Sequence, residues 1–110
     1  MTLLLLASDG MGEGDPELGR RLLRSFLERL VEAGAHVDMI GCVNRGVYLT
    51  VEGSRALDSL RVLQSRGARV RSCITCLEFY GLADNLAIGE TGTMADLAQA
   101  MVAADKIVRP

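Results

Sequence analysis

Apolar residues along the chain form short continuous runs that alternate with segments of helical periodicity. Residues 3–7 are an unbroken apolar run that stops at Ser8-Asp9-Gly10, which is typical of a buried strand in a parallel sheet. Similar patterns predict further strands over residues 36–43, 68–74, 86–90 and 107–108. Residues 47–51 are also apolar, and their pattern leaves strand and coil open.

The helical segments begin and end at recognisable capping residues. Asp15 followed by Pro16 predicts the start of a helix that runs to about Ala33 and ends at Gly34. Its charged face offers two pairs at i,i+4 spacing, Glu17–Arg21 and Arg24–Glu28. Further helices are predicted from a Ser54 cap to Gly67, over residues 77–84, and from a Thr93-x-x-Asp96 capping box through residue 104.

Strands that alternate with helices predict one α/β domain over residues 1–110, with a mostly parallel sheet between two layers of helices. Ligands of such open sheets bind at the carboxyl ends of the strands. Three loops follow predicted strands at that edge, namely residues 8–15, 42–46 and 73–76. We therefore expect the functional site where these loops converge.

Composition narrows the class of protein. The 110 residues carry 12 basic and 14 acidic side chains for a net charge of −2, and the two signs are interleaved. With no basic stripe, two Phe, two Tyr and no Trp, the chain offers little for nucleic acid. No apolar run approaches the length of a membrane helix, and no leader is evident, so we expect a soluble, cytoplasmic protein. Three cysteines, an odd count, indicate reduced thiols rather than a disulfide framework.

The most specific motif is Cys73-Ile74-Thr75-Cys76, placed where a strand is predicted to turn into a helix. A helix N-terminus favours the thiolate, which is the nucleophile in sulfur transfer and in disulfide exchange. Zinc would need Cys42 and His36 as additional ligands, and we expect no metal because His36 is better explained as the start of a strand. The plain alternative is a pair of small, half-buried thiols that pack under a loop.

The other two loops carry weaker signals. Asn44, Arg45 and Gly46 form a turn by default, and a functional interpretation places Arg45 and the loop amides beside Cys73, where positive charge lowers a thiol pKa. The glycines of residues 10–14 would supply further donors to that thiolate. The run lacks the last glycine of a dinucleotide fingerprint, because Asp15 stands there, so no nucleotide cofactor is expected. The apolar residues 47–49 suggest burial in a subunit interface.

With these residues in place, the sequence resembles the DsrE/DsrF-like family of small sulfur-relay proteins, and within it the DsrE-like C-terminal domain of YedF-type proteins linked to selenium metabolism. The resemblance spans the whole chain. Its motifs are Ser8-Asp9-x-x-Gly12-x-Gly14-Asp15, Asn44-x-Gly46-Val47, Ser72-Cys73-x-Thr75-Cys76-Leu77 and Tyr80-Gly81-Leu82. YedF-type proteins carry a TusA-like domain ahead of this one, whereas this chain begins directly at the first strand.

The resemblance implies a flavodoxin-like order of parallel strands, a homo-oligomer (a dimer or a trimer), and a TusA-like carrier as partner. It implies a persulfide on Cys73, with Cys76 as the additional thiol of the YedF-like branch. We therefore expect a sulfur carrier in which Asp9, Gly10, Gly12, Asn44, Arg45, Gly46 and Thr75 surround the thiols. Two alternatives are a non-catalytic oligomeric binding module and a C-x-x-C dithiol oxidoreductase, although thioredoxin-type motifs follow an early strand and enter a long helix.

Overall fold

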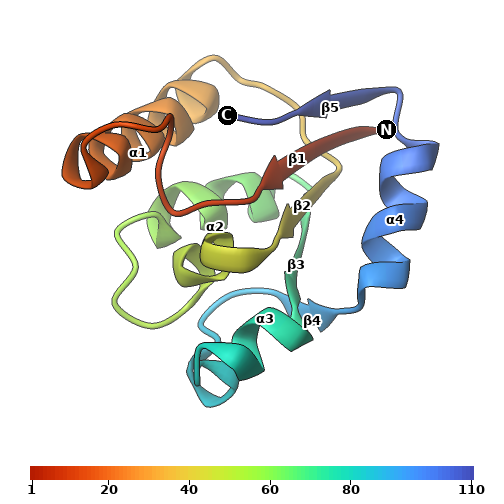
Figure 1. Ribbon diagram of the computed structural model, residues 1–110. Coiled ribbons are helices and arrows are strands. Elements are labelled where there is room, and N and C mark those ends of the chain that lie inside the picture. The colour runs from red at the N-terminus through yellow and green to blue at the C-terminus, as the bar shows by residue number, and fades with distance from the viewer.

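The computed structural model describes all residues, 1–110, and forms a five-stranded sheet in which every strand is parallel to its neighbours (Figure 1). The strands are β1 (Thr2–Leu6), β2 (Met39–Cys42), β3 (Arg69–Cys73), β4 (Glu90–Gly92) and β5 (Lys106–Val108). The α-helices are α1 (Pro16–Glu32), α2 (Leu57–Ser65), α3 (Ile74–Phe79) and α4 (Met94–Ala103), and η1 (Asn44–Thr50) and η2 (Ala83–Asn85) are 3-10 helices.

The strand order β4-β3-β2-β1-β5 explains how the helices divide between the two faces. The first three connections all advance in one direction across the sheet, whereas the connection through α4 returns from β4 to the far side of β1. Right-handed crossovers that advance in opposite directions lie on opposite faces. Accordingly, α1, α2 and α3 cover one face and α4 alone covers the other (Figure 1).

Two unequal cores hold the three layers together. The larger contains Leu4, Leu6 and Ile40 of the sheet, packed against helix residues that include Leu27 and Leu60. The smaller, under α4, consists of only Leu3, Leu5 and Leu97, with partly buried neighbours. The predicted flavodoxin-like, three-layer α/β class is thus confirmed. The strand order differs from the 2-1-3-4-5 order of flavodoxin, because β1 pairs with both β2 and β5.

Capping residues set α1 and α4 as the sequence predicts. Asp15 accepts the Leu18 N–H at 2.9 Å with Pro16 in the first turn, and Thr93 and Asp96 form a reciprocal capping box. Ser54 is not the cap of α2; its hydroxyl accepts the Ala56 N–H at 3.1 Å, and the helix begins three residues later than Ser54.

Other element boundaries differ from prediction. The second strand begins at Met39 rather than at residue 36, the third helix begins at Ile74 rather than at residue 77, and the fourth strand lies at Glu90–Gly92 rather than at 86–90. Ile88 is buried in the larger core instead of standing in the sheet. Tertiary packing, which no local pattern records, sets each of these shifts.

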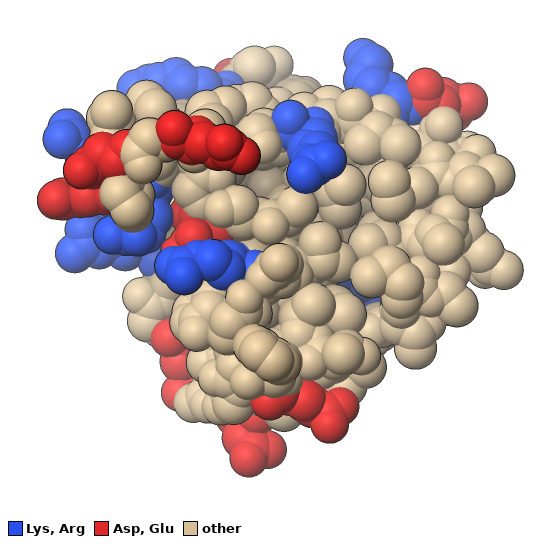
Figure 2. Space-filling view, viewed as in Figure 1, with Lys and Arg blue, Asp and Glu red and all other residues tan.

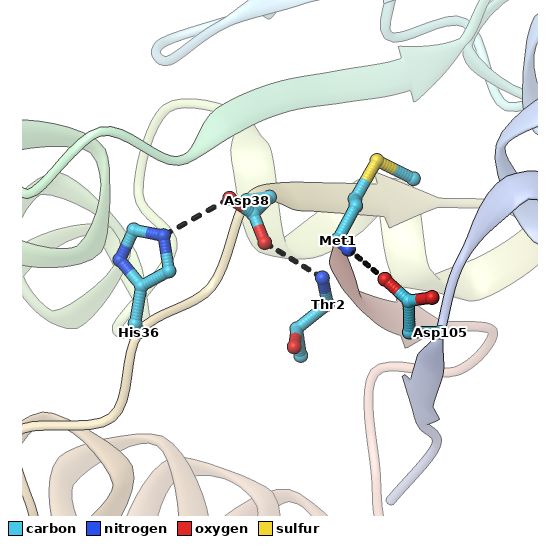
Figure 3. A network of polar contacts seen from close by, with 5 residues as sticks. All are labelled: Met1, Thr2, His36, Asp38 and Asp105. Carbon is cyan, nitrogen blue, oxygen red and sulfur yellow. Dashed lines mark hydrogen bonds and ion pairs between the residues drawn. The ribbon is translucent and has the colours of Figure 1, made fainter.

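At the amino ends of the strands, polar contacts hold the edge of the sheet opposite to the cysteines (Figure 3). The Asp38 carboxylate accepts the Thr2 N–H at 2.6 Å and contacts the His36 ring at 2.9 Å. The N-terminal ammonium group of Met1 pairs with Asp105. The Thr2 N–H, assisted by His36, lowers the pKa of Asp38 below its usual value.

Candidate functional site

Cys73 is the last residue of β3, and its side chain turns toward α4. The preceding Ser72 faces the opposite layer, where its hydroxyl lies 2.7 Å from that of buried Thr50, and successive strand residues alternate between faces. Cys73 is 7% exposed and lines a small pocket together with Gly92 and Met94 at the start of α4. The pocket offers about 20 Å³, which is room for one water-sized group. The pocket that Cys73 lines therefore has room for about one additional atom.

Cys76, in the first turn of α3, faces the opposite layer and receives a hydrogen bond. The backbone N–H of Asn44 donates to the Cys76 sulfur at 3.1 Å. Burial raises the pKa of the Cys76 thiol above its ordinary value, the Asn44 amide partly offsets this, and the neighbouring Cys73 thiol raises it further. The two sulfurs thus interact, so a negative charge on one disfavours a negative charge on the other.

Asn44 has an unusual backbone conformation, and its side chain bonds an aromatic neighbour. Its φ of 51° lies in the left-handed region, which is uncommon for a residue other than glycine. The hydroxyl of Tyr80 donates to the Asn44 side-chain oxygen at 2.5 Å, and the Tyr80 ring packs against Tyr48, with 5.1 Å between centroids. Tyr80 is not among the site residues predicted from the sequence. Its place in the Tyr-Gly-Leu motif is the one feature of the sequence that could have indicated its role.

Arg45 is engaged by a carboxylate rather than by a thiol. Its guanidinium donates to both oxygens of Asp9, at 3.1 and 3.0 Å, and lies 5.8 Å from the centre of the Tyr48 ring. The hydrogen bond from Arg45 lowers the pKa of Asp9. Arg45 is expected as a positive charge beside Cys73, and in the structure its hydrogen-bond partner is Asp9. The donor to a cysteine of the motif is the Asn44 amide, which bonds Cys76.

The glycines of the site act through the backbone. A Cβ on Gly46 would lie 1.9 Å from the carbonyl oxygen of Leu6, so only glycine allows η1 to pack against the end of β1. Gly10 approaches Gly19 of α1, a contact that brings the Met11 N–H to the Gly19 carbonyl at 2.9 Å.

The remaining predicted site residues lie at the surface. Gly12 is exposed with a φ of +80°, and Thr75 is exposed on α3 and makes no side-chain hydrogen bond. The amide of Gly10 donates to the Ser8 hydroxyl and that of Met11 to the Gly19 carbonyl, so these two loop amides are used within the loop and α1. The contacts that join the three loops are Asp9–Arg45 and Asn44–Cys76.

The apolar segment of residues 47–51 is part of the larger core rather than of a subunit interface. Val47 is fully buried, and Leu49 and Val51 are nearly so, all within the same molecule. This observation removes the support that the segment gave to an assembly role. Only Tyr48 of this stretch reaches the surface.

Cys42 and His36 lie at opposite ends of the β2 region. Cys42 is buried, and burial raises the pKa of its thiol to about 12, so it stays protonated at neutral pH. His36 is exposed beside Asp38, at the amino ends of the strands. No three His, Cys, Asp or Glu side chains come together as a possible metal-binding group. The protein also contains no helix with the length and apolar character needed to cross a membrane.

Comparison with solved structures places this fold among known proteins. The YchN protein of E. coli, which has a DsrE-like fold, superposes with a TM-score of 0.72 at 20% identity, covering 99% of this chain and 98% of its own. MTH1491 from Methanobacterium thermoautotrophicum gives 0.68 at 18% identity, covering 99% and 97%. BT1422 from Bacteroides thetaiotaomicron gives 0.64 at 18%, covering 99% and 94%; both are proteins of unknown function.

The fold is thus consistent with a DsrE-like fold over the whole chain. No protein-family profile matches the sequence, and no curated protein is similar to it in sequence. Since these solved structures share 20% identity or less with the chain, they establish its architecture alone.

Proposed function

We propose that this protein is a sulfur-relay domain in which Cys73 accepts a sulfane sulfur and passes it to the thiol of a partner protein. The observation that carries the proposal is the place of Cys73. Cys73 lies at the carboxyl end of β3, an inner strand of the sheet, and lines a pocket with room for about one atom. A second thiol, that of Cys76, follows three residues later. The DsrE-like fold of YchN supports the same interpretation.

The chemistry requires only thiols and a donor persulfide. The Cys73 thiolate attacks the outer sulfur of a donor R–S–SH; the donor's S–S bond breaks, R–S⁻ departs, and Cys73–S–SH remains. The pocket beside Met94 and Gly92 would hold the added sulfur. An acceptor thiolate then attacks that outer sulfur and releases the Cys73 thiolate, which restores the protein. The same exchange would carry selenium in place of sulfur.

Cys76 would reset a carrier that finds no acceptor. Its thiolate attacks the inner sulfur of the Cys73 persulfide, releases HS⁻ and leaves a Cys73–Cys76 disulfide, which an external dithiol then reduces. The raised pKa of Cys76 keeps this reaction slow while an acceptor is present, because the thiolate is the attacking species. The partner proposed for forward transfer is a small carrier of the TusA-like type.

We also propose that the protein is a homo-oligomer, a dimer or a trimer, which assembles through α4. Met94, Met101 and Val102 are 59%, 39% and 89% exposed on this helix. Figure 2 shows that charged side chains gather over the side where α1 lies, and that the side of α4 is almost free of them. A contiguous apolar surface is typical of protein interfaces. Sedimentation of the protein and of Val102→Glu tests this assembly.

A two-stage labelling experiment tests the relay. Reduced protein is loaded from a polysulfide carrying radiolabelled sulfur, desalted, and then mixed with a thiol acceptor. We expect the protein and Cys42→Ala to take up label and release it to the acceptor, and Cys73→Ala to take up none. Equal uptake by Cys73→Ala would refute the proposal. A Cys73–Cys76 disulfide formed without any uptake of label would favour the dithiol oxidoreductase instead.

A further inference from the structure

A second concave feature lies beside the cysteine site and is lined by arginines. It is a groove of about 480 Å³ between the first half of α1 and the segment that leads into α2. We call it the arginine groove; its charged lining residues are Asp9, Glu17, Arg20, Arg21, Arg24 and Arg55. The groove has no part in the sulfur chemistry described above, so its charges need another explanation.

The arginines of this groove have no partners within the protein. None of the four forms an ion pair, and none donates a hydrogen bond to the protein. The i,i+4 pairs predicted for α1, Glu17–Arg21 and Arg24–Glu28, do not form; its one ion pair is Arg29–Glu32. Asp9 is already neutralised by Arg45. Four guanidinium groups therefore face one uncompensated carboxylate, in a protein whose net charge is −2.

The groove is linked to Cys76 through three residues. Tyr48 lines the groove, and its ring lies 5.1 Å from that of Tyr80. The Tyr80 hydroxyl bonds Asn44, whose amide in turn donates to Cys76. A molecule that occupies the groove would therefore lie beside the residues that position the Cys76 sulfur.

We infer that the arginine groove binds an acidic segment of the protein that exchanges sulfur with Cys73. Arginine forks bind carboxylates in a bidentate manner, and a local positive charge on an otherwise acidic protein orients an acidic partner as it approaches. Arg20 and Arg24 stand one helical turn apart, the spacing of carboxylates at i and i+4 on an acidic helix. The identity of the partner as a sulfur-exchanging protein rests on the proposed function.

Binding is tested with a fluorescein-labelled helical peptide that carries glutamates at i,i+4 spacing, and with the same peptide carrying glutamines. Anisotropy at low ionic strength measures the affinity. We expect the glutamate peptide to bind and Arg20→Gln/Arg24→Gln to weaken binding at least tenfold. The matched control is Arg69→Gln/Arg109→Gln, which removes the same charge from two unpaired, exposed arginines outside the groove. We expect it to change the affinity less than twofold.

Three results would overturn the inference. The first is no binding of the glutamate peptide, and the second is equal weakening by the two double variants, which would show that only net charge matters. The third is displacement of the peptide by inorganic pyrophosphate at equal concentration of negative charge, which would identify the groove as a site for small phosphate compounds.

The same peptide reports delivery to the thiols when it ends in a cysteine activated as a thiopyridyl disulfide. A protein thiolate attacks the peptide sulfur, a mixed disulfide forms, and 2-thiopyridone leaves and is followed by its absorbance. We expect the glutamate peptide to react at least fivefold faster than the glutamine peptide, and Arg20→Gln/Arg24→Gln to abolish this difference. Equal rates for both peptides on the unmodified protein would refute delivery from the groove.

The two proposals fail separately. The anisotropy measurement uses no sulfur chemistry, so it reads the groove equally well in Cys73→Ala. If sulfur uptake fails while the peptide binds, the relay is refuted and the groove is retained as a binding site for acidic peptide. If uptake succeeds while the peptide does not bind, the groove inference alone is refuted.

Discussion

The backbone N–H of Asn44 donates to the sulfur of Cys76 across 3.1 Å, although the two residues are 32 positions apart in the sequence. This contact joins the loop after β2 to the helix after β3. It makes the ionisation of Cys76 depend on where η1 lies, and η1 is itself fixed by Tyr80, Asp9 and the close packing of Gly46. The ionisation of Cys76 therefore depends on the segment that follows the neighbouring strand, β2.

Tyr80→Phe should slow the alkylation of Cys76. The change removes the hydroxyl that holds the Asn44 side chain, so the amide bond to the sulfur loosens and its stabilisation of the thiolate decreases. A weakened hydrogen bond of about 1 kcal/mol corresponds to roughly a fivefold lower rate at neutral pH. Mass spectrometry of iodoacetamide-treated peptides measures the rate at Cys76 alone.

Tyr48→Phe is the matched control, because the Tyr48 hydroxyl makes no hydrogen bond within the protein. Its Cys76 should react at the unmodified rate. Equal slowing in the two variants would show that ring packing, rather than the bond to Asn44, governs Cys76.

Gly46→Ala should destabilise the whole domain. The new methyl group would meet the Leu6 carbonyl oxygen at 1.9 Å, and a backbone atom cannot move aside without displacing β1. We expect a loss of about 3 kcal/mol or more in the free energy of unfolding, measured by urea denaturation. Gly14→Ala, which meets nothing within 4 Å, should change the midpoint little. Similar midpoints for both variants would contradict this account of η1.

The sequence predicted those parts of the fold that local chemistry encodes. Asp15-Pro16 and the Thr93–Asp96 box mark the starts of α1 and α4 because a cap bonds residues within one turn. The apolar run before Ser8 predicts β1 because this pattern, too, is contained in a few consecutive residues. The convergence of the three loops follows from the parallel arrangement of β1, β2 and β3.

The sequence could not supply the partners within the site. Whether Arg45 meets a thiol or Asp9 depends on how η1 folds over β1, and η1 begins with a left-handed Asn44 that no periodicity predicts. Residues 47–51 suggested an interface because their burial partners lie on other elements. The sequence also could not show that Arg20, Arg21 and Arg24 of α1 are unpaired, because an i,i+4 spacing allows an ion pair without ensuring that one forms.

Asp9→Asn should lower stability in a pH-dependent manner. Arg45 lowers the pKa of Asp9 in the folded state, so the pair stabilises the protein above the unfolded pKa, near 4, and this contribution is lost as pH falls through the folded value. At pH 7 we expect a loss of about 0.5–1 kcal/mol for this partly exposed pair. Urea midpoints from pH 7 down to about pH 3 measure the difference.

As the pH falls below about 4, the gap between Asp9→Asn and the unmodified protein should begin to narrow. Asp84→Asn, which removes an exposed and unpaired carboxylate, serves as the control and should show no comparable loss at pH 7. A gap that stayed constant with pH would show that the Asp9 carboxylate is not charged in its pair with Arg45.

The central claim is that Cys73 binds the transferred sulfur, and the most direct test is to locate that sulfur on the protein. Reduced protein, Cys73→Ala and Cys76→Ala are each treated with a sulfane-sulfur donor and examined by intact-mass and fragment-mass spectrometry. The relay predicts the gain of one sulfur atom on Cys73 in Cys76→Ala, where it persists. In the unmodified protein the same adduct decays to a Cys73–Cys76 disulfide with release of sulfide. Sulfur found on Cys76, or gained equally by Cys73→Ala, would contradict the account.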